Sequence, residues 1–181
     1  MDDGYAHGGD RLGPMTTETQ RILFAPKTAT VRLTEHWHVV KDGDVAAKEL
    51  HLRHYSKYTY KDGREPKLFV GPGEKLVLLT EHADALFVWR KFVDEWLKDT
   101  AVWCAIFRNE SDVLSSTLIL EAERVAQCRW PGEPVYTHVR PTSVLSTNPG
   151  YCFKKSGWKT FGKSGSGTIV LRKTPVKEVF A

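Results

Sequence analysis

Short apolar segments and longer segments with helical spacing alternate along the chain. Apolar runs of strand length at 75–80, 85–90 and 135–139 predict strands, and the turn residues at 81–84 join the first two as a hairpin. The nearly continuous apolar run at 101–107 predicts a central strand that is buried on both faces. These runs predict a sheet at the centre of the molecule.

Two segments carry apolar residues at the spacing of an amphipathic helix. Within 43–58, Ala46 and Leu50 recur at helical spacing, and Asp44 is placed to cap the first turn. Within 108–130, a longer stripe predicts the main helix, which starts near Ser111 or Asp112; the stripe consists of Leu114, Leu118, Ala122 and Val125.

The remaining segments complete the order of elements. Residues 21–40 alternate well enough for one or two strands, and 93–100 predicts a short helix. Residues 148–158 predict a short helix that begins after a Pro-Gly pair, and the segments 159–162 and 167–173 predict closing strands. The alternation of strands and helices in the second half predicts an α/β fold with a mixed sheet.

Composition places the chain among globular proteins. It has 181 residues, 41% hydrophobic and 27% charged, and no apolar run approaches the length of a membrane span. Residues 1–20 contain no signal peptide and are expected to be a disordered leader. The three cysteines form no CxxC pair, which argues against a disulfide framework and favours the cytoplasm.

Charge is concentrated near the carboxyl end. The formal net charge is +4, but residues 148–181 contain seven lysines and arginines against one glutamate. A local basic segment fits a polyanion such as nucleic acid or the phosphates of a nucleotide cofactor. The pattern fits a solvated face equally well.

The segment 101–126 contains the first arrangement of residues that could bind a ligand. A buried strand leads into a polar loop that opens a helix, and the free N–H groups of such a helix start bind phosphate. Arg108 can add a cation, and Ser115 and Ser116 can add hydroxyl groups. An ordinary capped helix after a strand explains the same pattern, and the pattern alone favours that interpretation.

Histidines form the second arrangement. His36 and His38 are expected on one face of a strand, and His51 and His54 on one face of a helix. Four imidazoles allow a metal site, but the sequence places no carboxylate ligand beside them, so we predict no metal. Proton transfer by His54 or Tyr55 is the stronger functional hypothesis, and half-buried surface histidines are the alternative.

The third arrangement lies in the short helix of 148–158. Tyr151 is a candidate general acid, because a phenol can protonate a leaving thiolate. Cys152 is a candidate nucleophile, but no His or Asp near it in the sequence supports that role, and core packing is favoured.

Together, "AIFRNESDVLSSTLILEA", "VYTHV" and "NPGYCFKKSGW" resemble the GCN5-related N-acetyltransferase superfamily. "HYS" at 54–56, the serine-bearing loop and "GYCFKKSGW" are most similar to its Mom-like branch, phage-associated proteins that modify bases in DNA. The resemblance covers roughly residues 45–173. It implies one domain over 21–181, with a central mixed, mostly antiparallel twisted sheet flanked by helices.

The resemblance also implies an activity and a set of residues. The expected reaction transfers an acyl group from acetyl-CoA or another acyl-CoA to a nucleobase amine in DNA, with acyl-CoA and DNA as partners in a phage-infected or bacterial cytoplasm. The catalytic candidates are His54, Tyr55, Ser56, Glu110, Tyr136 and Tyr151. Of these, His54 or Glu110 is expected to take the amine proton, and Tyr151 or Tyr136 to protonate the leaving sulfur. The cofactor-binding candidates are Ala105, Ile106, Phe107, Arg108, Asn109, Ser115, Ser116, Asn148 and Phe153. The DNA-binding candidates are Lys154, Lys155, Lys159 and Lys163.

The sequence departs from the family pattern at three places. The usual Gly-rich "RxxGxG/A" loop is "RNESDVLSS" here, so hydroxyl groups replace exposed glycine N–H groups. The tyrosine expected before "KKSGW" is Phe153, and Tyr151 lies about 200° away on a helix. The aspartate expected after the penultimate strand has no match in "HVRPTS".

Three other functions remain open from the sequence. The chain could acetylate a small amine or a protein, or bind nucleic acid without catalysis on the same scaffold. It could also use His36, His38, His51 and His54 as a metal-dependent enzyme. The oligomeric state is open, with a homodimer one option, and no membrane association is expected.

Overall fold

The computed structural model describes residues 31–57, 60–64, 66–144 and 146–175, so the predicted leader and the first part of 21–40 lie outside it. The strands are β1 (Val31–Arg32), β2 (His38–Val40), β3 (Glu74–Leu79), β4 (Ala85–Asp94), β5 (Asp99–Asn109), β6 (Val135–Val139), β7 (Lys159–Lys163) and β8 (Ile169–Lys173). The helices are α2 (Val45–Leu52), α3 (Ser115–Arg129), α4 (Tyr151–Lys155) and the 3-10 turn η1 (Pro141–Ser143).

The strands form one open sheet of eight in the order β1-β2-β3-β4-β5-β6-β8-β7. Neighbouring strands are antiparallel except β5 and β6, which run parallel. The long helix α3 connects these two strands, as a parallel crossover requires. The prediction of an α/β domain with a mixed, mostly antiparallel sheet is confirmed.

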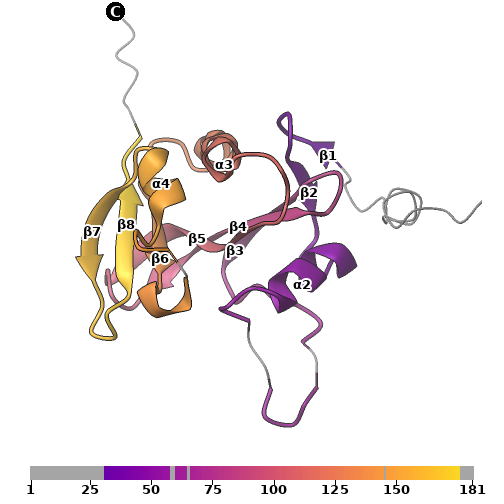
Figure 1. Cartoon of the computed structure of the whole chain (residues 1–181), viewed down its shortest axis with the longest axis horizontal. Coiled ribbons are helices and arrows are strands. Elements are labelled where there is room, and N and C mark those ends of the chain that lie inside the picture. Colours follow the sequence, from indigo (N-terminus) through magenta and orange to yellow (C-terminus); the bar gives the residue numbers. More distant parts are fainter. Residues whose placement is uncertain (1–30, 58–59, 65, 145, 176–181) are drawn as a thin grey trace, which may run out of the picture.

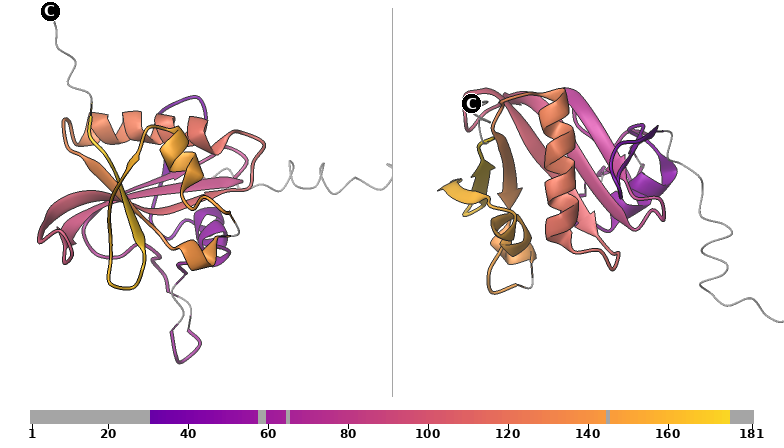
Figure 2. Two further views of the ribbon diagram at one scale, coloured as in Figure 1. Left: turned by 60° about the vertical axis from the view of Figure 1, so that its left-hand side comes forward. Right: turned by 90° about the horizontal axis from the view of Figure 1, so that it is seen from above.

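Helices cover the two faces of the sheet unequally. In Figure 1, α3 and α4 lie above the sheet and α2 lies below its amino-terminal half, and Figure 2 shows α3 from two further directions. The buried residues of α3, such as Leu118 and Ala122, pack on Phe87 and Trp89 of β4. On the other face, Leu50 of α2 packs in a second cluster with Val77 and Val88.

No described helix is long and apolar enough to cross a membrane.

Both main helices are present, but only α2 begins where the sequence predicted. Asp44 caps α2 as predicted, because its Oδ1 accepts a hydrogen bond from the backbone N–H of Ala47 at 3.0 Å. The predicted start of α3 near Ser111 or Asp112 is wrong. The helix starts at Ser115, and Leu114, which was expected in its apolar stripe, is the exposed N-cap residue.

The predicted helix at 93–100 is also wrong, because this segment is the tight turn between the long antiparallel strands β4 and β5. The Asp94 carboxylate accepts hydrogen bonds from the backbone N–H groups of Trp96 (3.0 Å) and Leu97 (2.9 Å). Lys98 completes the turn with a φ of +58°. These local bonds within a hairpin outweigh the helical spacing of its apolar residues.

A bulge interrupts the pairing of β4 with β5. Val88 pairs with Ile106, whereas the next residue of β4, Trp89, pairs with Cys104. Ala105 is therefore an extra residue in β5, and its side chain is exposed. Bulges of this kind redirect a strand and free its backbone groups, and they are common beside functional sites.

Candidate active site between the parting strands

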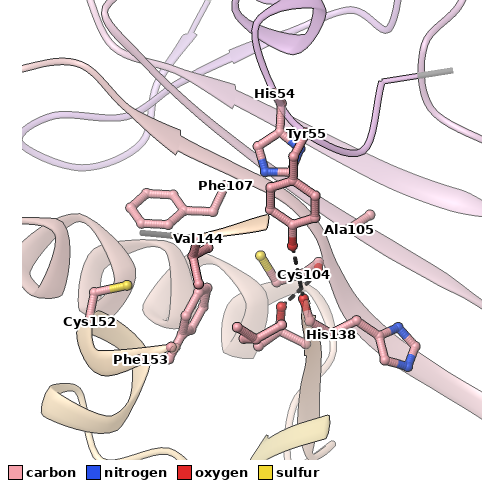
Figure 3. A pocket seen from close by; sticks show the side chains of 12 residues that line it. His54, Tyr55, Cys104, Ala105, Phe107, His138, Val144, Cys152 and Phe153 are labelled. Carbon is pink, nitrogen blue, oxygen red and sulfur yellow. Dashed lines mark hydrogen bonds between the residues drawn. The ribbon is translucent and has the colours of Figure 1, made fainter. Parts of the chain in front are cut away.

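A pocket lies where the two parallel strands separate. β5 and β6 pair over only three positions, which end at Cys104 and Thr137, whereas β5 continues to Asn109 and β6 to Val139. Figure 3 shows the side chains that line the resulting space. They are His54, Tyr55, Cys104, Ala105, Phe107, Thr137, His138, Val139, Val144, Gly150, Cys152 and Phe153.

A side-chain hydrogen bond links β5 and β6 at the point where they separate. The Thr137 hydroxyl donates a hydrogen bond to the Cys104 carbonyl at 3.1 Å, at the last point where the two strands meet. Beyond this link, none of the described strands pairs with the edge of β5 at the Ala105 bulge on the pocket side. An edge of this kind can hydrogen-bond an extended ligand, such as one that contains amides.

Tyr55 reaches across the gap between the strands. It follows α2, and its hydroxyl donates a hydrogen bond to the His138 carbonyl on β6 at 3.4 Å (Figure 3). Burial raises the pKa of the phenol, while contacts with Arg140 oppose the rise. Tyr55 therefore stays protonated at neutral pH and can act as a proton donor.

His54 lies beyond the end of α2 and is buried, so the expected helix face of His51 and His54 does not form. Its Nδ1 accepts a hydrogen bond from the backbone N–H of Ser56 at 3.2 Å and lies 2.7 Å from the Ser56 hydroxyl. The neutral ring therefore carries its proton on Nε2. Burial, followed by the nearby His51 and Arg108 charges, lowers the pKa of His54 to about 4, against an opposing hydrogen bond with the Phe107 backbone.

Glu110 joins the end of α2 to the end of β5. Its carboxylate accepts hydrogen bonds from Arg53 at 2.8 and 2.9 Å and from Arg108 at 2.5 Å. Those guanidinium groups lower the pKa of Glu110 to about 2, with the Arg53 hydrogen bond the largest cause. Arg108 also donates to the Arg53 carbonyl. Glu110 is thus a poor proton acceptor. Its contacts with Arg53 and Arg108 favour a structural role, in which it links the end of α2 to the end of β5.

Asn109 organises the loop between β5 and α3. Its Nδ2 donates hydrogen bonds to the Val113 carbonyl at 2.7 Å and to the Ser115 hydroxyl at 3.1 Å. Its Oδ1 accepts hydrogen bonds from the N–H and hydroxyl of Ser111. Side-chain bonds therefore fix this loop where the family pattern has glycines.

The start of α3 leaves donors available. Leu114 provides no side-chain cap, and its carbonyl accepts the N–H groups of Thr117 and Leu118. In the described part of the chain, the N–H groups of Ser115 and Ser116 have no hydrogen-bond partner. Such N–H groups at the start of a fifteen-residue helix can bind a phosphate.

The short helix α4 closes the pocket from the side. Gly150 has a φ of +74°, and a Cβ there would lie 2.8 Å from Leu171 Cδ1, so only glycine allows α4 to start so close to the sheet. Phe153 is buried and lines the pocket, while Tyr151 is 56% exposed and is not among the lining residues. The Asn148 carboxamide lies before α4 and accepts a hydrogen bond from Lys154 at 2.7 Å.

The other predicted residues lie apart from the pocket lining. Tyr136 is buried beside Trp103 on the face away from α3, and Ile106 packs in the core under α2. Lys155 is exposed on α4, whereas Lys159 and Lys163 lie on the edge strand β7.

The four histidines do not form a metal site. No three of them bring ligand atoms within 4.8 Å of one another, and His36 instead contacts Glu121 at 2.7 Å. His36 precedes β2, so it does not share a strand face with His38. The only group of possible metal ligands found in the described residues is Glu35, His36 and Glu121, and the Glu121 oxygens already accept hydrogen bonds.

Sequence reasoning missed several lining residues. Cys104 was assigned only to a buried strand, and His138 and Thr137 only to the strand that follows α3. Their joint position depends on where β5 and β6 separate. The sequence "VYTHV" predicts a strand, but its pattern does not show at which residue the pairing of β6 with β5 ends.

A scan against protein-family models found no matching family, and a search of curated proteins found no matching relative.

Proposed function

We propose that the protein is a Mom-like acyltransferase of the GCN5-related type, which transfers an acyl group from acyl-CoA to a nucleobase amine in DNA. One observation carries the proposal. A pocket with a bulged strand edge lies where two parallel strands part, His54 and Tyr55 line it, and Ser56 contacts His54 from outside the lining. The order of strands and the helix that joins the parallel pair agree with the resemblance found in the sequence.

The acyl-CoA would lie against β5 and the start of α3. The edge at Ala105 would hydrogen-bond its amide groups, and the free N–H groups of Ser115 and Ser116 would hold its phosphates. The loop lacks the glycines of the family pattern, but Asn109 fixes it from within and leaves these N–H groups unpaired. The residues of this loop therefore fit acyl-CoA, although the loop differs in sequence from the family pattern.

The amine would attack the thioester carbonyl, forming a C–N bond as the C–S bond breaks. The Ser56 hydroxyl would take the amine proton while passing its own to Nδ1 of His54, which it contacts at 2.7 Å. A ring with a pKa of about 4 is a weak base, but it suffices for the strongly acidic nitrogen formed during attack. Tyr55 would protonate the departing sulfur, a role that the sequence suggested for Tyr151 or Tyr136.

A thiol-release assay tests the reaction. The purified protein, acetyl-CoA and single-stranded DNA should release free CoA thiol, and a Ser56→Ala variant should release it at least tenfold more slowly, because one step of the proton relay is lost. An Arg124→Glu variant on the exposed surface of α3 is the matched control and should retain the wild-type rate. Absence of release with acetyl-CoA and longer acyl-CoA donors would reject the proposal.

A further inference from the structure

Half of one sheet face carries aromatic rings, and none of the described helices α2, α3 and α4 packs over it. Below the sheet in Figure 1, α2 covers only the amino-terminal half. The cluster on the other half contains only strand and turn residues. We call this half of the sheet face the aromatic face. It is defined by a connected set of ring contacts between neighbouring strands and the β4–β5 turn, made by Phe92, Trp96, Trp103, Tyr136, His138 and Phe161.

Strand register sets cations on both sides of these rings. Arg90 pairs with Trp103, Trp103 with Tyr136, Tyr136 with Arg172, and Arg172 with Lys159. Directly paired residues share a face of a sheet, so this row crosses five strands on one side. Two aromatic residues at its centre are thus flanked by three cations.

The exposed rings rest on buried ones. Trp103 and Tyr136 are 2% and 8% exposed, whereas Trp96 and Phe161 are 40% and 45% exposed. Phe161 meets Trp96 and Tyr136 edge to face, and His138 stacks on Trp103 at a centroid distance of 4.2 Å. The accessible rings are therefore held in place by packing, which lowers the entropy lost when a flat ligand stacks on them.

Among the described residues, the cations of the row contact rings, a carbonyl and a hydroxyl group, and none contacts a carboxylate. Arg90 lies over the Phe92 ring at 3.9 Å and donates to the Pro72 carbonyl. Arg172 lies over the Phe161 ring at 4.9 Å. In the part of the chain that the structure describes, no carboxylate lies within ion-pair distance of Arg90, Arg172 or Lys159. Cations that have no carboxylate partner among the described residues and lie beside accessible rings are complementary to an anionic chain that carries flat groups.

We infer that the aromatic face binds an unpaired segment of a nucleic acid, as the substrate-binding surface of the proposed function on which this inference rests. Bases would stack on Trp96 and Phe161, and phosphates would contact Arg172 and Lys159. Bases of an intact duplex stack on each other and leave no free ring faces, so the surface fits single strands or opened duplex. His138 belongs to both this face and the pocket lining, so the bound strand leads to the pocket.

Fluorescence anisotropy with a labelled single-stranded oligonucleotide tests this inference, with the full chain and without acyl-CoA. The two phosphate contacts, at Arg172 and Lys159, predict a slope of log affinity against log salt of about −1.4. The Arg172→Glu, Lys159→Glu double variant should bind at least tenfold more weakly and with a flatter slope. The Trp96→Ala, Phe161→Ala variant should also lose about tenfold or more, with the slope unchanged.

Arg124→Glu, which reverses one charge on the exposed side of α3, should bind as the wild type does. Loss of affinity only with Lys154→Glu, Lys155→Glu would overturn the assignment to this face, and so would tighter binding to duplex or equal binding to polyaspartate. Because the assay needs no chemistry, modified DNA without single-strand binding would refute this surface alone. Single-strand binding without acyl transfer would refute the proposed function alone.

Discussion

The burial of His54 predicts a specific loss of stability in mild acid. The folded protein holds this ring neutral, with a pKa of about 4 against 6.5 for an unperturbed histidine. The unfolded chain therefore binds a proton more readily than the folded chain. The stabilisation is complete above pH 6.5 and is lost as the pH falls from 6.5 toward 4.

The size of the effect follows from the two pKa values. Their difference corresponds to about 3 kcal/mol of unfolding free energy below both values, and to about 2 kcal/mol at pH 5. His54 is 8% exposed, so solvent screening does not remove this term. His51 is also buried, and burial lowers its pKa. The pH dependence of wild-type stability would therefore combine the contributions of several groups.

Comparison with a variant isolates His54. In His54→Asn, the side-chain oxygen can accept the Ser56 N–H in place of Nδ1, but the residue does not titrate. Urea unfolding followed by tryptophan fluorescence at pH 7.5, 6 and 5 should show the wild type losing about 2 kcal/mol more than this variant. The exposed His82→Asn should behave as the wild type. Parallel pH dependences in wild type and His54→Asn would refute the reasoning.

Four further substitutions test the site and the core. Tyr55→Phe should lower the rate of thiol release about 100-fold if the phenol is the proton donor; an unchanged rate would remove Tyr55 from the chemistry. Glu110→Gln should keep activity within about threefold, since it breaks a surface clamp worth about 1 kcal/mol or less; a collapse of kcat in a folded variant would restore Glu110 as the base. Asn109→Ala should raise the Kd for acetyl-CoA about tenfold in calorimetry, because the loop loses bonds each worth about 1 kcal/mol; an unchanged Kd would separate loop and cofactor. Leu118→Ala should cost about 2–5 kcal/mol in urea unfolding, as a fully buried leucine of α3; a cost below about 1 kcal/mol would contradict the packing described.

The sequence predicted the elements that carry strong periodicity. The run at 101–107 became the central strand because nearly every residue in it is apolar, and Asp44 capped α2 because its side chain reaches the first turn. The turn at Asp94 escaped prediction, since its local bonds compete with a helical pattern over only eight residues. Leu114 was misplaced because Asn109 and Ser111 hold the loop open for longer than the apolar stripe indicates.

The site was predictable only in part. His54 and Tyr55 were chosen for their chemistry, and both line the pocket. Strand alternation places Tyr136 and His138 on one face of β6, but which side of the sheet that face covers depends on tertiary packing. The aromatic face depends on register across five strands, which no local pattern in the sequence contains.

Nucleoside mass spectrometry of plasmid DNA tests the central claim most directly, since it needs no prior choice of acyl donor or base. DNA from cells that express the protein should contain a nucleoside whose mass has increased by an acyl-derived group. DNA from cells that express Tyr55→Phe at the same level should contain little or none. Unmodified nucleosides in the presence of folded wild-type protein and an acyl-CoA supply would contradict the account.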